Sequence, residues 1–290
     1  MSSTIAVGVD GLEPSLIALR WAVAEAALRG ASLVAVIARP SALDWPHDSP
    51  RHVDEVNRHI SDRIDQIREG IEGALSHSTG PAGVGSSAVE IQVIEGHPNE
   101  VLVGVSKRVD LLVVGGHGYS GWKGAVSGSL TGQLAGHTVT PLAVVRQIPE
   151  RGRGRILVGV DGLSSAEAIR FGLSEAALRG ASVTAVSTWQ YPVLGTRPTS
   201  PEAAELLEEG ARGLLEEAIS ACGEHAEVRL DRVVQMGHPV EVLVERAGSA
   251  DLVVVGSRGR GGFAALLLGS VALGVLHRVA GPVVIVPRDR

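Results

Sequence analysis

Residues 7–12 read VGVDGL, and residues 158–163 repeat the same six letters. Residues 25–32 read EAALRGAS, and they recur without a change at residues 175–182. The two copies lie roughly 150 residues apart, which is far longer than the period of a solenoid or a propeller. The chain is therefore predicted to be a tandem duplication of one domain.

A stretch rich in Pro, Gly and Arg marks the boundary between the copies. It reads QIPERGRG at residues 147–154 and separates two apolar segments, as connections between domains do. We expect a first domain over residues 1–146 and a second over residues 155–290, with 147–154 as the linker. Each domain is long enough to bury a core without disulfides or metal.

Each copy alternates short apolar runs with segments of helical periodicity. In the first copy, strands are expected at residues 5–9, 33–38, 88–94, 111–114 and 142–145. Helices are expected at residues 16–28, 51–75, 98–107 and 128–137, and the second copy repeats this order. Continuous apolar strands that alternate with helices indicate an α/β domain with a five-stranded parallel sheet, doubly wound and covered on both faces.

Composition excludes several classes of partner. Lys and Arg number 26 against 32 Asp and Glu, a formal net charge of −6, which argues against nucleic acid as the main partner. The single cysteine, Cys222, excludes an internal disulfide framework. No signal-peptide pattern opens the chain, and no apolar run approaches the roughly 20 residues of a membrane span. We expect a cytoplasmic protein that binds no membrane.

A glycine-rich loop follows the fourth expected strand of each copy. Both loops fit the spacing G-x2-G-x9-G-S, with Gly115, Gly118, Gly128 and Ser129 in the first copy and Gly256, Gly259, Gly269 and Ser270 in the second. Glycine lets the backbone take a positive φ and approach a ligand closely. A loop of N–H groups that ends at a helix N-terminus attracts anions, so the spacing predicts a phosphate-binding loop.

The carboxyl ends of the first and second strands carry the other candidate residues. Ligands of doubly wound sheets bind at this edge, where the strand order reverses. Asp10 and Asp161 follow the first strand, and Val36 and Val186 lie in the second. A simpler role for Asp10, capping the first helix or closing a turn, stays open.

With these two marks, V-G-V-D and G-x2-G-x9-G-S, nearly the whole chain resembles tandem universal stress proteins of the ATP-binding subgroup. The resemblance implies two Rossmann-like domains, similar to adenine nucleotide alpha hydrolases, with strand order 3-2-1-4-5. It also implies a regulatory role in stress response, with ATP as the ligand and Mg²⁺ bound through the phosphates.

The resemblance assigns contacts to individual residues. Asp10 and Asp161 would contact the ribose or a phosphate-bound Mg²⁺, and the backbone at Val36 and Val186 would meet the adenine. The other implied ATP contacts are Gly8, Gly115, His117, Gly118, Gly121, Gly128 and Ser129 in the first copy and Gly159, Gly256, Arg258, Gly259, Arg260, Gly262, Gly269 and Ser270 in the second. Because His117 and Tyr119 stand where the second copy has Arg258 and Arg260, we expect tighter binding in the second copy.

The sequence contains no catalytic constellation that we recognise. Residues 10–13 read DGLE, where adenylating enzymes of this fold typically carry S-G-G-x-D. We therefore expect an ATP-binding regulatory protein rather than an enzyme. A slow ATPase or another nucleotide-dependent enzyme is the alternative, and a scaffold with vestigial sites is a third.

The fifth strands suggest how the copies associate. Residues 142–145 and 283–286 are short and apolar, and the implied strand order puts each at a sheet edge. Because an exposed apolar edge favours aggregation, we expect the two domains to pair through these strands. A homodimer of whole chains and an unidentified regulatory protein are further expected partners.

Overall fold

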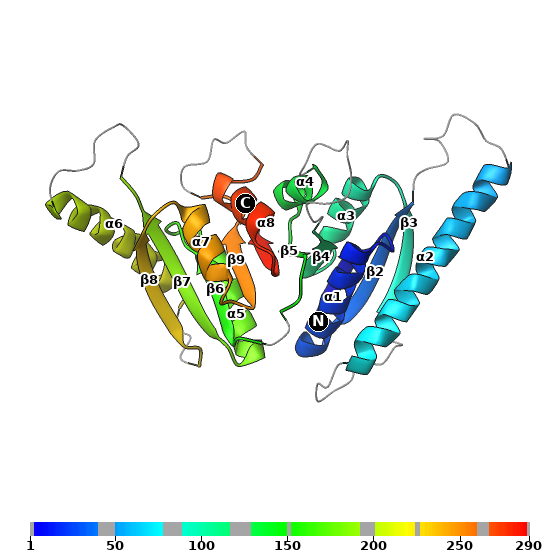
Figure 1. The fold of residues 1–290 in the computed structure, drawn as a ribbon, viewed down its shortest axis with the longest axis horizontal. Coiled ribbons are helices and arrows are strands. Elements are labelled where there is room, and N and C mark those ends of the chain that lie inside the picture. The colour runs from blue at the N-terminus through cyan, green and yellow to red at the C-terminus, as the bar shows by residue number, and fades with distance from the viewer. Residues whose placement is uncertain are drawn as a thin grey trace. The chain divides into compact units, whose positions relative to one another are not determined.

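The structure is a computed structural model, and it describes residues 3–39, 50–77, 89–116, 129–149, 152–191, 201–223, 227–259 and 267–288. The chain divides into two compact units, Met1–Ile148 and Pro149–Arg290. The division falls inside the stretch predicted as a linker. Within the described ranges, each unit contains five strands and four helices (Figure 1).

The first unit is a parallel sheet with helices on both faces. Its strands are β1 (Thr4–Gly8), β2 (Ser32–Arg39), β3 (Val89–Glu95), β4 (Leu111–Gly115) and β5 (Leu142–Val145). They pair in the order β3-β2-β1-β4-β5. The helices are α1 (Glu13–Arg29), α2 (Pro50–His77), α3 (Pro98–Ser106) and α4 (Ser129–His137). Helix α1 packs against α2, and α3 packs against α4, so each pair covers one face.

The second unit repeats this architecture. Its strands are β6 (Arg155–Gly159), β7 (Ser182–Trp189), β8 (Leu230–Met236), β9 (Leu252–Gly256) and β10 (Val283–Val286). They pair in the order β8-β7-β6-β9-β10. The helices are α5 (Ala166–Arg179), α6 (Pro201–Ser220), α7 (Pro239–Ala247) and α8 (Ser270–Arg278). The predicted fold class and strand order 3-2-1-4-5 are confirmed in both units.

Burial explains why five of the strands are apolar along almost their whole length. Side chains of β1, β4, β5, β9 and β10 are almost completely buried, because helices cover both faces of these strands. None of the helices in the described part of the chain is long and apolar enough to cross a membrane. Pairing between the two fifth strands stays a prediction.

The repeated letters EAALRGAS produce the same local structure twice. Glu25 accepts a hydrogen bond from Arg29 over 2.7 Å although only 1% of Glu25 is exposed, and Glu175 is paired with Arg179 in the same way. Burying a carboxylate is costly unless it is paired, so the arginine one turn later is required. Gly30 and Gly180 then end α1 and α5 in the left-handed conformation, with φ of 61° and 60°.

Two uncrowded glycines of the second unit show the effect of backbone conformation alone. An added Cβ meets no atom within 4 Å at Gly180, which is left-handed, or at Gly213, which lies inside α6. We expect Gly180→Ala to lower the free energy of unfolding by about 1 kcal/mol. Gly213→Ala should raise it by up to about 1 kcal/mol, because alanine favours helix. Urea denaturation of both variants measures this, and shifts of the same sign would contradict the assigned backbone conformations.

Candidate functional site

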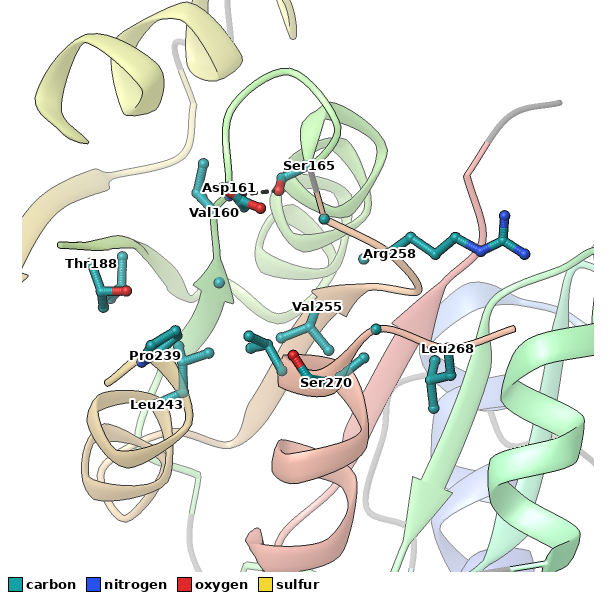
Figure 2. A pocket seen from close by; sticks show the side chains of 17 residues that line it. Val160, Asp161, Ser165, Thr188, Pro239, Leu243, Val255, Arg258, Leu268 and Ser270 are labelled. Carbon is teal, nitrogen blue, oxygen red and sulfur yellow. Dashed lines mark hydrogen bonds between the residues drawn. The ribbon is translucent and has the colours of Figure 1, made fainter. Parts of the chain in front are cut away.

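A cavity of about 480 Å³ lies at the carboxyl edge of the sheet in the second unit. The ends of β6, β7 and β9 and the first turns of α7 and α8 enclose it (Figure 2). Eight of the residues proposed from the sequence line this cavity: Gly159, Asp161, Val186, Gly256, Arg258, Gly259, Gly269 and Ser270. The structure therefore gathers segments that lie as much as 111 residues apart, from 159 to 270, around one space.

The first unit is described less completely at this edge. Gly8 and Gly115 end β1 and β4, Asp10 follows β1, and Val36 lies within β2 beside Gly8, as their counterparts do in the second unit. His117, Gly118, Gly121 and Gly128 lie outside the described residues, and so does the side chain of Ser129. In the second unit, Arg260 and Gly262 also lie outside them.

The turn after β6 positions Asp161. Its N–H donates to Ser165 Oγ over 2.8 Å, and Ser164 Oγ donates to its carbonyl oxygen over 2.8 Å. Gly162 has a φ of 67°, which allows the chain to reverse into α5. These bonds hold the backbone of Asp161 at the rim of the cavity (Figure 2).

In the corresponding turn of the first unit, the side-chain carboxylate of Asp10 accepts a hydrogen bond. Asp10 Oδ1 accepts the N–H of Leu12 over 3.0 Å, and Ser15 Oγ accepts the N–H of Asp10 over 3.2 Å. Asp10 therefore does close a turn, as the simpler interpretation expects. A carboxylate has about four acceptor positions, so this bond leaves room for a ligand.

Gly115 and Gly259 are needed for close approach and not for positive φ. Gly115, Gly256, Gly259 and Gly269 are all absent from the left-handed region, so the expectation that these glycines take positive φ is wrong for the described ones. A Cβ on Gly259 would overlap the carboxylate of Asp161. The loop after β9 thus lies directly against the end of β6, and that contact closes one side of the cavity.

The N-terminus of α8 forms another side of the cavity. Gly269 donates its N–H to Ser257 O over 2.8 Å, so the fold already uses that group. Leu273 donates to Gly269 O over 3.0 Å, which is the first bond of the helix. The backbone N–H groups of Ser270, Val271 and Ala272 precede the first N–H that donates within α8, so they have no acceptor inside the helix. All three residues line the cavity. With no acidic residue in this first turn, the helix end favours an anion.

The opposite part of the cavity is mostly apolar. Thr188, Pro239 and Leu243 lie there (Figure 2), and Val186 is another apolar residue of the cavity lining. The carbonyl of Val186 accepts the N–H of Val160 over 2.8 Å, just as Val36 accepts from Val9 over 2.9 Å. The arrangement can hold a flat apolar group at one end and an anion at the other.

Some lining residues were not foreseen from the sequence. Pro239 and Leu243 belong to α7, and Leu268, Val271 and Ala272 surround the start of α8. Their apolar spacing predicts only that they are buried. Which buried residues face the open edge depends on how α7 and α8 cross the sheet, and periodicity does not carry that information.

Comparison with known proteins divides the chain at nearly the same place as the structure does. The model of the universal stress protein family matches residues 1–146 and again residues 152–287. The chain belongs to the universal stress protein family. The predicted family, with two copies in tandem, is confirmed.

Relatives within the family match this chain over almost its whole length, both copies included. The universal stress protein Rv2623 of Mycobacterium tuberculosis is 32% identical over 305 residues, which cover 97% of this chain and 95% of the relative. A universal stress protein of Mycolicibacterium smegmatis is 32% identical over 294 residues, covering 97% and 96%. The crystal structure of a universal stress protein from Archaeoglobus fulgidus matches all of both chains with a TM-score of 0.68 and 17% identity, and it supports the fold alone.

Two equivalent loop glycines of this universal stress protein differ in how crowded they are. A Cβ on Gly115 would lie 2.5 Å from the carbonyl oxygen of Pro14, whereas the nearest atom to one on Gly256 is 3.5 Å away. We expect Gly115→Ala to destabilise the first unit by about 1–3 kcal/mol, because two backbone segments must separate. Gly256→Ala should leave the second unit nearly unchanged.

Amide hydrogen exchange resolved by mass spectrometry tests this pair. Peptides from α1 should exchange faster in Gly115→Ala, and peptides from α5 should keep their protection in Gly256→Ala. Equal loss of protection in both variants would show that the crowding at Gly115 does not control stability.

Proposed function

We propose that this chain is an ATP-binding regulatory protein of the stress response, with one nucleotide site in each unit. The observation that carries the proposal is the cavity of the second unit, with its apolar part beside Val186 and Leu243 and the first turn of α8 at another side. Adenine is flat and largely apolar on its faces, and triphosphate is strongly anionic. A site with these two ends suits both parts of one ligand.

Asp161, at the rim of the cavity, takes the place proposed for the ribose. In this arrangement the adenine contacts Val186 and Leu243, and the phosphates extend along Gly256 and Gly259 to the N–H groups at Ser270. The Ser270 hydroxyl adds one more donor to a phosphate oxygen. Gly8, Asp10, Val36 and Gly115 take the equivalent roles in the first unit.

The donor set also fits a phosphate-bound Mg²⁺. Mg²⁺ retains several waters and is usually held by one or two carboxylates together with phosphate oxygens. Asp161 supplies one such carboxylate at the cavity, and Asp10 stands at the same place in the first unit. When bound, the metal would neutralise part of the phosphate charge.

Binding without efficient turnover is the function we favour. Phosphoryl transfer needs an oriented water and strong stabilisation of charge in the transition state. Of the described residues lining the cavity, Asp161 and Arg258 alone have titratable side chains. The guanidinium of Arg258 extends away from Asp161 (Figure 2). A cytoplasmic location, a homodimer and a regulatory protein partner remain part of this proposal.

Mass spectrometry of nucleotide released from the denatured, freshly purified protein distinguishes the candidate functions. We expect ATP. ADP alone would instead favour a slow ATPase. No nucleotide on purification, and no binding when ATP is added back, would favour a scaffold and contradict the proposal.

We expect Gly259→Val to block ATP binding at the site in the second unit. The added side chain would overlap the carboxylate of Asp161 and occupy the phosphate path. We expect calorimetric titration of the nucleotide-free variant to find one ATP site per chain where the natural protein has two. Gly213→Val, in α6 and away from the cavity, is the matched control, since an added Cβ there meets no atom within 4 Å. Two sites of unchanged affinity in Gly259→Val would contradict the assignment.

A further inference from the structure

The base end of the second unit's cavity, where the proposed function puts the adenine, contains one polar side chain. Thr188, Pro239 and Leu243 lie at this end, and Val186 is a further apolar residue of the lining. Proline, leucine and valine side chains carry no polar atom, so among these described residues only Thr188 has a side chain that can form a hydrogen bond. A ligand group that fills the base end therefore comes against the Thr188 hydroxyl.

The alternation of side chains along β7 places Thr188 on the cavity face of the sheet. Residues two apart in a strand share a face, and neighbours point to opposite faces. Val186 and Thr188 both line the cavity, whereas Ser187 and Trp189 do not. Figure 2 shows the Thr188 oxygen directed toward the side where Asp161 lies, into the space that the labelled residues surround.

The Thr188 hydroxyl forms no hydrogen bond within the described part of the chain. Two other hydroxyls near this edge do: Ser164 Oγ donates to the carbonyl oxygen of Asp161, and Ser165 Oγ accepts the N–H of Asp161, each over 2.8 Å. Thr188 is only partly buried, so water hydrates its hydroxyl before a ligand arrives. A ligand that displaces this water must replace the hydrogen bond.

A hydroxyl at the base end favours some apolar groups over others. The surfaces of Val186, Pro239 and Leu243 suit any flat apolar group. A hydrocarbon group would displace water and leave the Thr188 hydroxyl without a partner, which carries a desolvation cost. Adenine has ring nitrogens that accept hydrogen bonds and an amine that donates them, and a hydroxyl can pair with either.

We propose that the Thr188 hydroxyl hydrogen-bonds the edge of the adenine in the second unit and thereby selects a heteroaromatic base for this site. The inference rests on the proposed function and adds a residue that the family resemblance does not assign. Ala38 stands at the equivalent place in the first unit, two residues beyond Val36, as Thr188 lies two residues beyond Val186. The contact is therefore a property of the second unit alone.

Thr188→Val tests the proposal, because valine keeps the branched shape and replaces the hydroxyl by a methyl group. In calorimetric titration of the full chain, we expect the ATP affinity of the second site to fall about tenfold, the scale of one hydrogen bond. Adenosine affinity should fall by the same factor, since the phosphates are not involved. Thr188→Ser keeps the hydroxyl and should restore the binding of both ligands.

Two controls assign the effect to the second site. Thr184→Val removes a hydroxyl from the same strand at a buried residue that does not line the cavity, and it should leave ATP affinity unchanged. Adding Thr188→Val to the Gly259→Val chain should also change nothing further, because the second site is already blocked. A further loss of ATP binding in that double variant would contradict the assignment.

Urea denaturation without nucleotide separates recognition from a structural role. The free energy of unfolding should not fall in Thr188→Val, since no described group loses a hydrogen bond and valine favours strands. A loss of stability that accompanies the loss of affinity would show that the hydroxyl supports the fold, and it would overturn the proposal.

The ligand series supplies the remaining outcomes. Unchanged ATP affinity in Thr188→Val would overturn the proposal, and so would a loss for ATP that adenosine does not share, because the hydroxyl would then act on the phosphates. Binding by Thr188→Ser as weak as that by Thr188→Val would overturn it as well. No binding of ATP by the natural protein would instead defeat the proposed function itself.

Discussion

The close approach of the loop after the fourth strand to the end of the first strand is the constraint on which this site depends. In the second unit the two segments meet where Gly259 lies against the Asp161 carboxylate, with no space for a Cβ. In the first unit the described close approach is a different one, between Gly115 at the end of β4 and the backbone of Pro14 in α1. Because the central strands are buried on both faces, neither segment can move apart without disturbing the core.

The site is therefore a consequence of the sheet order. Placing the first strand between the second and the fourth brings their carboxyl ends together, and the helices that follow must leave in opposite directions. The gap between them is the cavity. Asp161 and the start of α8 then face each other across it without any dedicated scaffold.

Much of this could be predicted from the sequence. The duplication follows from motifs that recur in both copies, and the gathering of Asp161 with Gly256, Gly259 and Ser270 follows from their places at the carboxyl ends of strands. The strand order was expected from the family resemblance. The conformation of the loop glycines could not be predicted, because glycine is needed both for positive φ and for crowded contacts. Sequence alone does not tell which of the two applies at Gly259.

Thr188 shows a different limit of sequence reasoning. It belongs to no motif, and polar residues do not alternate along residues 182–189, which read SVTAVSTW. Because helices cover both faces of the sheet, a polar residue in this strand gives no sign of the face that it occupies. Ser187 is 3% exposed and does not line the cavity, whereas its neighbour Thr188 does. Only the register of β7 with β6 decides between them, and a one-residue shift would exchange their faces.

The most direct measurement is a crystal structure of the protein grown with ATP and Mg²⁺. The account predicts density for adenine beside Val186 and Leu243, and for the triphosphate between Gly259 and the first turn of α8. An empty cavity at saturating ATP, or a nucleotide bound in the reverse orientation with its base at Ser270, would contradict it.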